Sequence, residues 1–307
     1  MKKGLLIVLV ALTHFMVGAQ IINIPDANFK QLLLDANPLL GTAKDINGNM
    51  ITIDINGNDE IEESEALNVY ELFVAYASIT DITGVEYFQN LTNLYIEGNE
   101  ISNDNFVNLT SLRVLNISEN QFTNANFSNL VNLEYLNFSD NQFNSVNLSA
   151  NLALKILDVS GNPLADLDVL SLTDLERVFV RNTTLTSLDV SNLPNLYDLD
   201  VIFNTNLTSL NVTGLVNLEG LECFSNNLTS LDVSTLTSLT FLRCEGNQIP
   251  TLDLTGLDLL ETVMCGWNLL TELDVSMLPL LDELRCSDNQ ITSLDISNNP
   301  LLDLLYC

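Results

Sequence analysis

Apolar residues recur along most of the chain in a frame of 21 or 22 residues. When each copy is numbered from its first apolar residue, positions 1, 4, 6, 11, 14, 16 and 19 are apolar in most copies. Positions 4 and 6 alternate with polar neighbours, and this period of two predicts a short strand with one buried face. The frame continues from residue 69 to the end, so one stacked array is expected rather than two domains. The copies begin at Val69, Leu91, Leu112, Leu133, Leu154, Leu175, Leu196, Leu218, Leu239, Leu260, Leu281 and Leu302.

Position 9 is asparagine in nine copies, at the predicted bend after the strand. A buried asparagine donates two hydrogens and accepts at its carbonyl, so a column of them satisfies the backbone of successive bends. Thr183 interrupts the column. Burying the apolar side chains of one copy contributes roughly 10–20 kcal/mol, about as much as ordering the copy costs, so stability must come from stacking. The asparagines are Asn99, Asn120, Asn141, Asn162, Asn204, Asn226, Asn247, Asn268 and Asn289.

The frame L-x-x-L-x-[apolar]-x-x-N-x-L resembles the leucine-rich repeat. From Val69 onward the chain resembles bacterial secreted proteins of this class that carry an internalin-like cap before the repeats. The L-T-S-L-D-V-S type segments at Leu185, Leu207 and Leu228 are similar to the 21-residue repeats of Bacteroidetes surface proteins. The resemblance implies an α/β fold: a right-handed leucine-rich repeat solenoid, or horseshoe, with a parallel concave sheet and a small helical N-terminal cap. It also implies short second strands or turns on the convex side.

The first 19 residues read as a signal peptide. Lys2 and Lys3 precede the apolar run 5–17, and small residues stand before Gln20. The run is too short and wrongly flanked for a stable membrane span. We therefore expect export, to the medium or to the cell surface, and no membrane span.

Charge and histidine content exclude several functions. Cleavage after residue 19 would leave 8 basic against 40 acidic residues, a net charge of −32 (8 − 40). Such a charge disfavours nucleic acid and anionic membranes as partners. The only histidine, His14, lies in the leader, so the exported chain has no His-dependent catalytic triad and no His-ligated zinc site. The chain is not expected to be an enzyme.

Residues 20–68 are predicted to cap the repeats. Ile24 to Asn37 reads as an amphipathic helix with Phe29, Leu32 and Leu33 on one face. Such a helix would cover the exposed apolar end of the first repeat.

Residues 54–65, D-I-N-G-N-D-E-I-E-E-S-E, resemble an EF-hand calcium loop. Asp59 stands where the loop normally has glycine, a departure that aspartate tolerates better than most residues. A site here would be structural, and Ca²⁺ is the only cofactor expected. The alternative is an acidic turn that caps a short helix over 62–68. The calcium ligands would be Asp54, Asn56, Asn58, Glu60 (through its carbonyl) and Glu65.

Five cysteines follow one another at intervals of 21 residues, all at position 6 of the frame. That position faces the core, so we expect free, buried thiols. Parallel side-chain directions make disulfides between neighbouring copies unfavourable. The last one, Cys307, falls in the middle of a predicted strand, so we expect a longer natural chain with a C-terminal cap. The cysteines are Cys223, Cys244, Cys265, Cys286 and Cys307.

Position 15 carries a column of acids on the predicted convex side. Such residues usually bond nearby backbone N–H groups, although stacked carboxylates can also collect divalent cations. The column contains Asp168, Asp189, Asp232, Asp253, Asp274 and Asp295.

The concave strand positions 2, 3, 5, 7 and 8 do not repeat. Between residues 175 and 267 they collect arginines and large apolar side chains, the composition of interface hot spots. We therefore expect a recognition or adhesion module that binds a protein on a host or neighbouring-cell surface. A glycan is the alternative ligand. The predicted contact residues are Arg177, Phe179, Arg181, Tyr197, Phe203, Phe224, Phe241, Arg243, Met264 and Trp267.

A catalytic alternative rests on Asp200 and Glu222. Both hold position 5 in adjacent copies, about 5 Å apart, close to the separation in a retaining glycoside hydrolase. The predicted face is open to water and offers no pocket to raise one carboxyl pKa. Binding is therefore favoured over hydrolysis.

Overall fold

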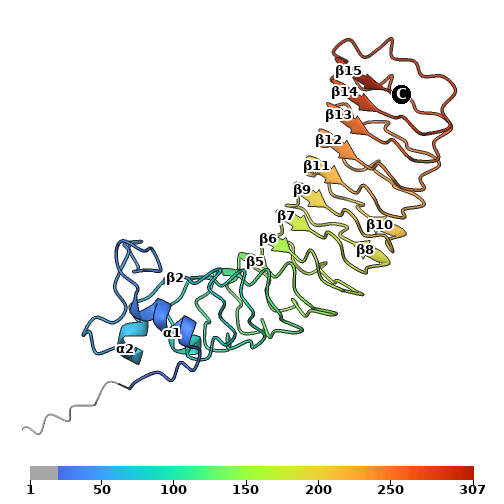
Figure 1. Ribbon diagram of the computed structural model, residues 1–307. Coiled ribbons are helices and arrows are strands. Elements are labelled where there is room, and N and C mark those ends of the chain that lie inside the picture. The colour runs from blue at the N-terminus through green and yellow to red at the C-terminus, as the bar shows by residue number, and fades with distance from the viewer. Residues whose placement is uncertain (1–19) are drawn as a thin grey trace, which may run out of the picture.

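A computed structural model describes residues 20–307 as a curved solenoid whose strands line the inner, concave side of an arc (Figure 1). Twelve parallel strands, one per copy of the frame, form a 13-stranded sheet with the antiparallel edge strand β1. The predicted parallel-sheet solenoid is thereby confirmed. The strands of this sheet are β1 (Ala43–Lys44), β2 (Glu71–Phe73), β3 (Asn93–Tyr95), β4 (Val114–Asn116), β5 (Tyr135–Asn137), β6 (Ile156–Asp158), β7 (Arg177–Phe179), β9 (Asp198–Asp200), β11 (Gly220–Glu222), β12 (Phe241–Arg243), β13 (Thr262–Met264), β14 (Glu283–Arg285) and β15 (Leu304–Tyr306).

Neighbouring parallel strands pair in register, so equal frame positions lie side by side. Leu221 pairs with Leu199 on one side and with Leu242 on the other. The extra residue of the copy that begins at Leu196 leaves this register intact. From β2 to β14 of this sheet, the central residue of each strand points into one continuous apolar core, while its two neighbours face the concave side.

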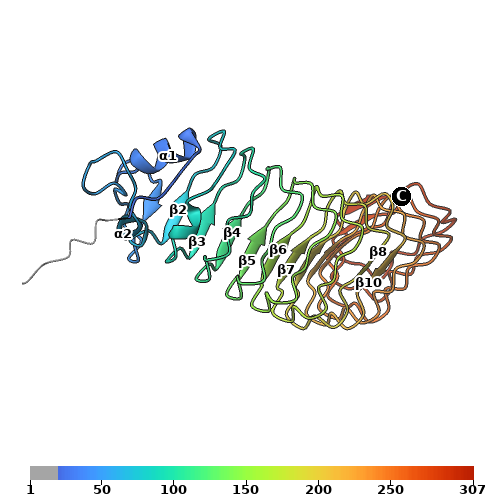
Figure 2. The same ribbon diagram turned by 90° about the horizontal axis from the view of Figure 1, so that it is seen from below.

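The convex side is mostly turns. β8 (Ser187–Asp189) and β10 (Ser209–Asn211) pair there as a small parallel sheet, on the side of the arc away from the main sheet (Figures 1 and 2). The convex side therefore contains both short second strands and turns, as predicted.

The asparagines at position 9 form the predicted hydrogen bonds with the backbone of the bends. Asn120 accepts from the Ile101 amide at 3.0 Å and donates to the Ile96 and Ile117 carbonyls at 2.9 and 3.3 Å. Each such residue therefore joins two successive repeats. At Thr183 the side chain instead donates to Asn204 Oδ1 at 2.7 Å.

The N-terminal cap holds two short helices, α1 (Ala27–Leu34) and α2 (Glu63–Ala66), and a 3-10 turn follows at η1 (Val85–Tyr87). α1 is shorter than the predicted 24–37, because Asp26 is extended and its side chain accepts from the Phe29 amide as an N-cap. Phe29 and Leu33 are fully buried. The predicted signal peptide lies outside the described residues, and among those described no helix is long and apolar enough to cross a bilayer.

Candidate functional site

The concave sheet gathers the ten predicted contact residues onto one continuous surface. β7, β9, β11, β12 and β13 are consecutive in the sheet. In-register pairing places Phe179, Asp200, Glu222, Arg243 and Met264 in one row across these strands.

Exposure differs sharply within this set. Trp267 is 60% exposed, Phe203 51% and Tyr197 39%. Phe179, Phe224, Phe241 and Met264 are half-buried between their neighbours. The three exposed rings are therefore the ones free to bury new surface on binding.

The half-buried rings serve as supports for arginines. The Arg243 guanidinium lies 3.7 Å from the centre of the Phe224 ring, and Phe203 meets that ring edge-on with centres 5.1 Å apart. The guanidinium groups of Arg177 and Arg181 lie 4.9 and 5.4 Å from the Phe179 ring centre. Such contacts fix otherwise flexible side chains.

Every arginine of the surface is also ion-paired. Arg177 bonds Asp198 at 2.8 Å, and Arg243 bonds Glu245 at 2.7 Å with Glu222 at 3.5 Å. All eight basic residues within 20–307 have an acidic partner. The arginines among the predicted contact residues are therefore already neutralised by acids of the same chain. Position within the frame does not reveal such pairs, because they depend on side-chain rotamers.

Asp200 and Glu222 are adjacent as predicted, but both are engaged. Arg181 donates to Asp200, whose side chain is only 4% exposed, while Glu222 faces Arg243. Burial raises the pKa of Asp200, and the Arg181 hydrogen bond lowers it again. Ion-paired carboxylates on an open sheet are poorly arranged for acid–base catalysis.

A second surface, which the sequence reasoning missed, lies at the N-terminal end of the concave side. Burial raises the pKa of Glu97 and of Asp140, and the Glu119 charge raises both further. The Tyr76 hydroxyl donates to Glu119 at 3.0 Å. Acids at positions 7 and 8 in three successive copies were the available sequence signal.

The predicted calcium loop has a compact turn built on carboxylates. Asp54 accepts from the amides of Gly57, Asn58 and Asp59 at 2.7–3.2 Å. Asp59 has the positive φ of 63° that the departure from glycine required. The conformation therefore accommodates the aspartate at this position.

Three other residues of the predicted calcium loop, Asn56, Asn58 and Glu65, also form hydrogen bonds within it. Glu65 accepts from the Ile55 amide at 2.8 Å, and the side chains of Asn56 and Asn58 bond Glu62. Burial raises the pKa of Glu65, and its hydrogen bond to the Glu62 carboxyl raises it further. The acids of this loop do not form a group of three with metal-binding geometry. Calcium therefore stays a prediction, one that would also use amide and carbonyl oxygens of the loop.

The sequence D-I-N-G-N occurs a second time, at residues 45–49, and forms a similar turn. Asp45 accepts from the amides of Asn47 and Asn49, both at 2.9 Å. This turn has no glutamate at the twelfth position, where Asn56 stands. It is therefore a natural control for the calcium loop.

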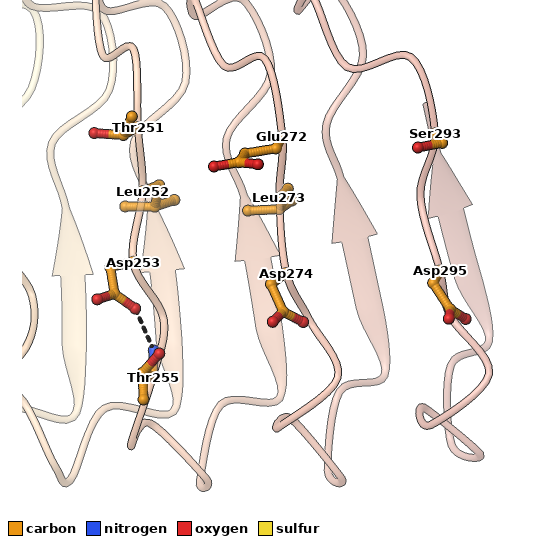
Figure 3. Close-up of a pocket in the computed structure, with 9 residues that line it drawn as sticks. All are labelled: Thr251, Leu252, Asp253, Thr255, Glu272, Leu273, Asp274, Ser293 and Asp295. Atoms are coloured by element: carbon orange, nitrogen blue, oxygen red, sulfur yellow. Dashed lines mark hydrogen bonds between the residues drawn. The ribbon is translucent and has the colours of Figure 1, made fainter.

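The convex acids form the expected turns. The Thr255 amide donates to Asp253 and the Ser276 amide to Asp274, both at 2.9 Å. Figure 3 shows these acids and Asp295 side by side along a hollow of the outer surface. Within residues 20–307, no group of three or more acids, histidines or cysteines has the geometry to hold a metal ion.

Four of the five cysteines occupy the core as expected, and the fifth does not. Cys223, Cys244, Cys265 and Cys286 are buried free thiols, and Cys307 is exposed. Burial raises the pKa of Cys223 to about 12, so the thiol form prevails at neutral pH.

Comparisons with known proteins place this geometry in a class. No protein-family model and no curated protein matches the sequence. The functional domain of InlJ from Listeria monocytogenes, described as including a cysteine ladder, is 30% identical with a TM-score of 0.66. That match covers 90% of this chain and 55% of the InlJ chain, so this chain spans about half of that relative.

Two further solved structures agree. YopM from Yersinia pestis, a leucine-rich effector protein, is 25% identical with a TM-score of 0.59, covering 76% of this chain and 73% of YopM. The internalin inlF from L. monocytogenes is 22% identical with a TM-score of 0.57, covering 94% and 98%, which shows the fold alone. The chain is a leucine-rich repeat solenoid, similar to internalins and other leucine-rich repeat proteins.

Proposed function

We propose that this chain is an exported recognition module that binds a protein on a host or neighbouring-cell surface through the middle of its concave sheet. The observation that best supports this proposal is the solvent exposure of the Tyr197, Phe203 and Trp267 side chains on the concave side. Large aromatic side chains on a rigid surface are typical anchors of protein interfaces.

The solenoid explains why the concave side can specialise. Positions 4 and 6 of the frame hold the core together, so positions 2, 3, 5, 7 and 8 can vary without loss of the fold. Solubilising charge would suffice there, yet the copies from Leu175 to Leu260 carry rings. Binding is favoured over catalysis because Asp200 and Glu222 are both ion-paired.

Capture of partners from cell surfaces tests the proposal. A Tyr197→Ser/Phe203→Ser/Trp267→Ser variant is expected to lose the partner that the wild type captures. Its matched control, Val131→Ser/Val216→Ser/Leu259→Ser, removes side chains that are 51, 49 and 45% exposed outside the concave sheet. Equal capture by the aromatic variant would refute the concave assignment.

The same experiment distinguishes the glycan alternative. Treating the cell surfaces with glycosidases should leave capture intact if the partner is a protein. Loss of capture after this treatment, with capture preserved after protease treatment, would favour sugar rings stacked on Tyr197 and Trp267.

A further inference from the structure

Position 8 of every complete copy from Leu91 to Leu281 has a left-handed backbone. Glycine occupies it at residues 98, 161 and 246, with φ of 64–67°. Asp140, Asn182 and Asp288 have φ of 52°, 51° and 55°. These residue types are the ones that tolerate this conformation. Ser225 and Glu119 have φ of 55° and 54°, and the Glu119 side chain accepts a hydrogen bond from Tyr76. The bend after each strand therefore favours small or Asx residues, which hold seven of these ten positions.

Phe203 and Trp267 break this preference. Their φ values are 58° and 50°, a region that bulky side chains disfavour. Both rings are more than half exposed, so burial in the core does not offset the unfavourable backbone. A disfavoured conformation retained at an exposed position points to a function.

The positive φ of a third aromatic residue, Tyr76, has a structural explanation. It also has a positive φ, 52°, and is exposed. Its hydroxyl, however, bonds Glu119, and its ring lies across Gly98, where a Cβ would come within 2.2 Å. Neither Phe203 nor Trp267 is held by a side-chain hydrogen bond, although Phe203 meets the edge of the Phe224 ring with centres 5.1 Å apart. The hydrogen-bonded explanation therefore covers Tyr76 alone.

The two rings stand apart with nothing large between them. Ser225 and Gly246 hold position 8 in the two intervening copies. Three strand spacings separate the rings, about 14 Å. This is the reach of four residues of extended chain, so one short segment can contact both rings.

The free charges on this part of the concave side are acidic. Asp288 is exposed beside Trp267, at position 8 of the next copy, while Glu219 and Glu261 are exposed at position 2, at the opposite ends of the strands from the rings. None of the three is ion-paired, whereas every basic residue within 20–307 is. The surface therefore offers free negative charge and no free positive charge, which suits a cationic partner.

We propose that Phe203 and Trp267 bind a basic, apolar segment of the partner protein. Apolar side chains of the segment pack on the two rings, and a lysine or arginine of the segment faces the free carboxylate of Asp288. Basic residues that flank the segment face Glu219 and Glu261 at the other end of the strands. The inference rests on the proposed concave-face function and specifies the chemistry of its ligand.

Selection from a random 12-residue phage-displayed peptide library, against purified residues 20–307, tests this proposal. Enriched peptides should carry net positive charge with aromatic or aliphatic residues, and their binding should weaken as salt is added. Their affinity for a Phe203→Asn/Trp267→Asn variant should fall at least tenfold. The matched control Val216→Asn should bind as the wild type does.

The thermal stability of the Phe203→Asn/Trp267→Asn variant provides a second, independent test. Asparagine suits the left-handed backbone, as Asn182 shows, so the melting temperature of the double variant should equal or exceed that of the wild type. A gain in stability with a loss of binding supports retention of the rings for function. A clear fall in melting temperature would show that the rings serve the fold, and would overturn the proposal.

The remaining outcomes separate this inference from the proposed function. Acidic or neutral peptides that still lose affinity on the double variant refute the basic ligand and leave the concave function standing. Peptides that bind both proteins equally, or no enrichment at all, refute the role of this ring pair. The proposed function itself fails if the Tyr197/Phe203/Trp267 variant captures cell-surface proteins unchanged, or if glycosidase treatment abolishes capture and protease treatment does not.

Discussion

At the scale of single residues, the asparagine column decides how the bends are satisfied. Asn247 accepts from the Leu228 amide at 3.0 Å and donates to the Cys223 and Cys244 carbonyls at 2.9 and 3.0 Å. All of these groups lie in the interior. Asn247 is thus the only partner of the Leu228 amide, and it gives the Cys223 and Cys244 carbonyls a second bond beside those from Asn226 and Asn268.

Asn247→Ala should therefore be strongly destabilising. Leaving the Leu228 amide unsatisfied costs about 1–3 kcal/mol, and losing one bond at each carbonyl adds about 0.5–1.5 kcal/mol, so a loss of about 3 kcal/mol is expected in denaturant unfolding. The exposed Asn227 makes one backbone bond, to the Thr205 carbonyl, and Asn227→Ala should cost about 1 kcal/mol or less. Equal losses in the two variants would show that the column contributes nothing special.

Thr183 interrupts the asparagine column, and a substitution there should increase stability. Without an asparagine at 183, the Val159 and Val180 carbonyls each receive one side-chain bond, where the Ile117 carbonyl receives two. Thr183→Asn should complete both and raise stability by about 1 kcal/mol. A lower unfolding midpoint would mean that the Thr183–Asn204 bond is worth more than the restored column.

Residue identities predicted the interior of each repeat but not its surface contacts. The frame predicts an interior location for asparagine at position 9 and for cysteine at position 6. The structure shows this for the asparagines except Asn289 and for four of the five cysteines. Long side chains such as Arg177 choose among partners by rotamer, which the frame does not specify. The left-handed position 8 was detectable from its Gly, Asn and Asp content.

At the scale of elements, the cap joins α1 and α2 to the first strand through a carboxylate-rich loop. Calcium should raise the melting temperature of EDTA-dialysed protein, because it would bind the folded loop and not the unfolded chain. Glu65→Gln should abolish this calcium-dependent rise. Since Glu65 also accepts from the Glu62 amide at 3.1 Å, the variant should be less stable even without calcium.

Asp45→Asn is the control for that experiment. It alters the second D-I-N-G-N turn, which lacks the twelfth-position glutamate. The calcium-dependent rise should persist in this variant. A rise that survives Glu65→Gln would place the ion elsewhere, for example at the convex acids.

The acidic surface spanning β3, β4 and β5 should make stability depend on pH. The pKa of Glu97 is raised by burial and by Glu119, so the folded state favours the protonated acid. Its contribution is therefore favourable below this raised pKa and is lost as the pH rises through it. Glu97→Gln should stabilise the fold at pH 7 by up to about 1 kcal/mol.

The pH profile distinguishes this cause from a general effect of the amide. The advantage of Glu97→Gln should vanish below about pH 4, where glutamate is protonated in both states. Glu100→Gln, exposed on the same repeat, should change little at either pH. An advantage that persists at low pH would contradict the electrostatic explanation.

At the scale of the whole molecule, periodicity made the fold predictable and left the ligand open. Each repeat constrains only its neighbours, so the register of Leu199, Leu221 and Leu242 follows from the frame. The identities of the concave residues are not determined by the fold, and on the proposed function they are determined by the partner. Trp267 and Phe203 could be named from the sequence, but their strained backbone and the neutralised arginines required coordinates.

The stacked interior also makes a prediction about the thiols. Cys223, Cys244, Cys265 and Cys286 lie behind the sheet, while Cys307 is exposed. In residues 20–307, a thiol reagent should therefore label one cysteine in the native protein and all five in denaturant without reductant. Because repeats open with their neighbours, the four buried thiols should become reactive over the same denaturant range as loss of the circular dichroism signal. Two or four thiols that stay unreactive in denaturant would reveal disulfides and overturn the expectation of free cysteines.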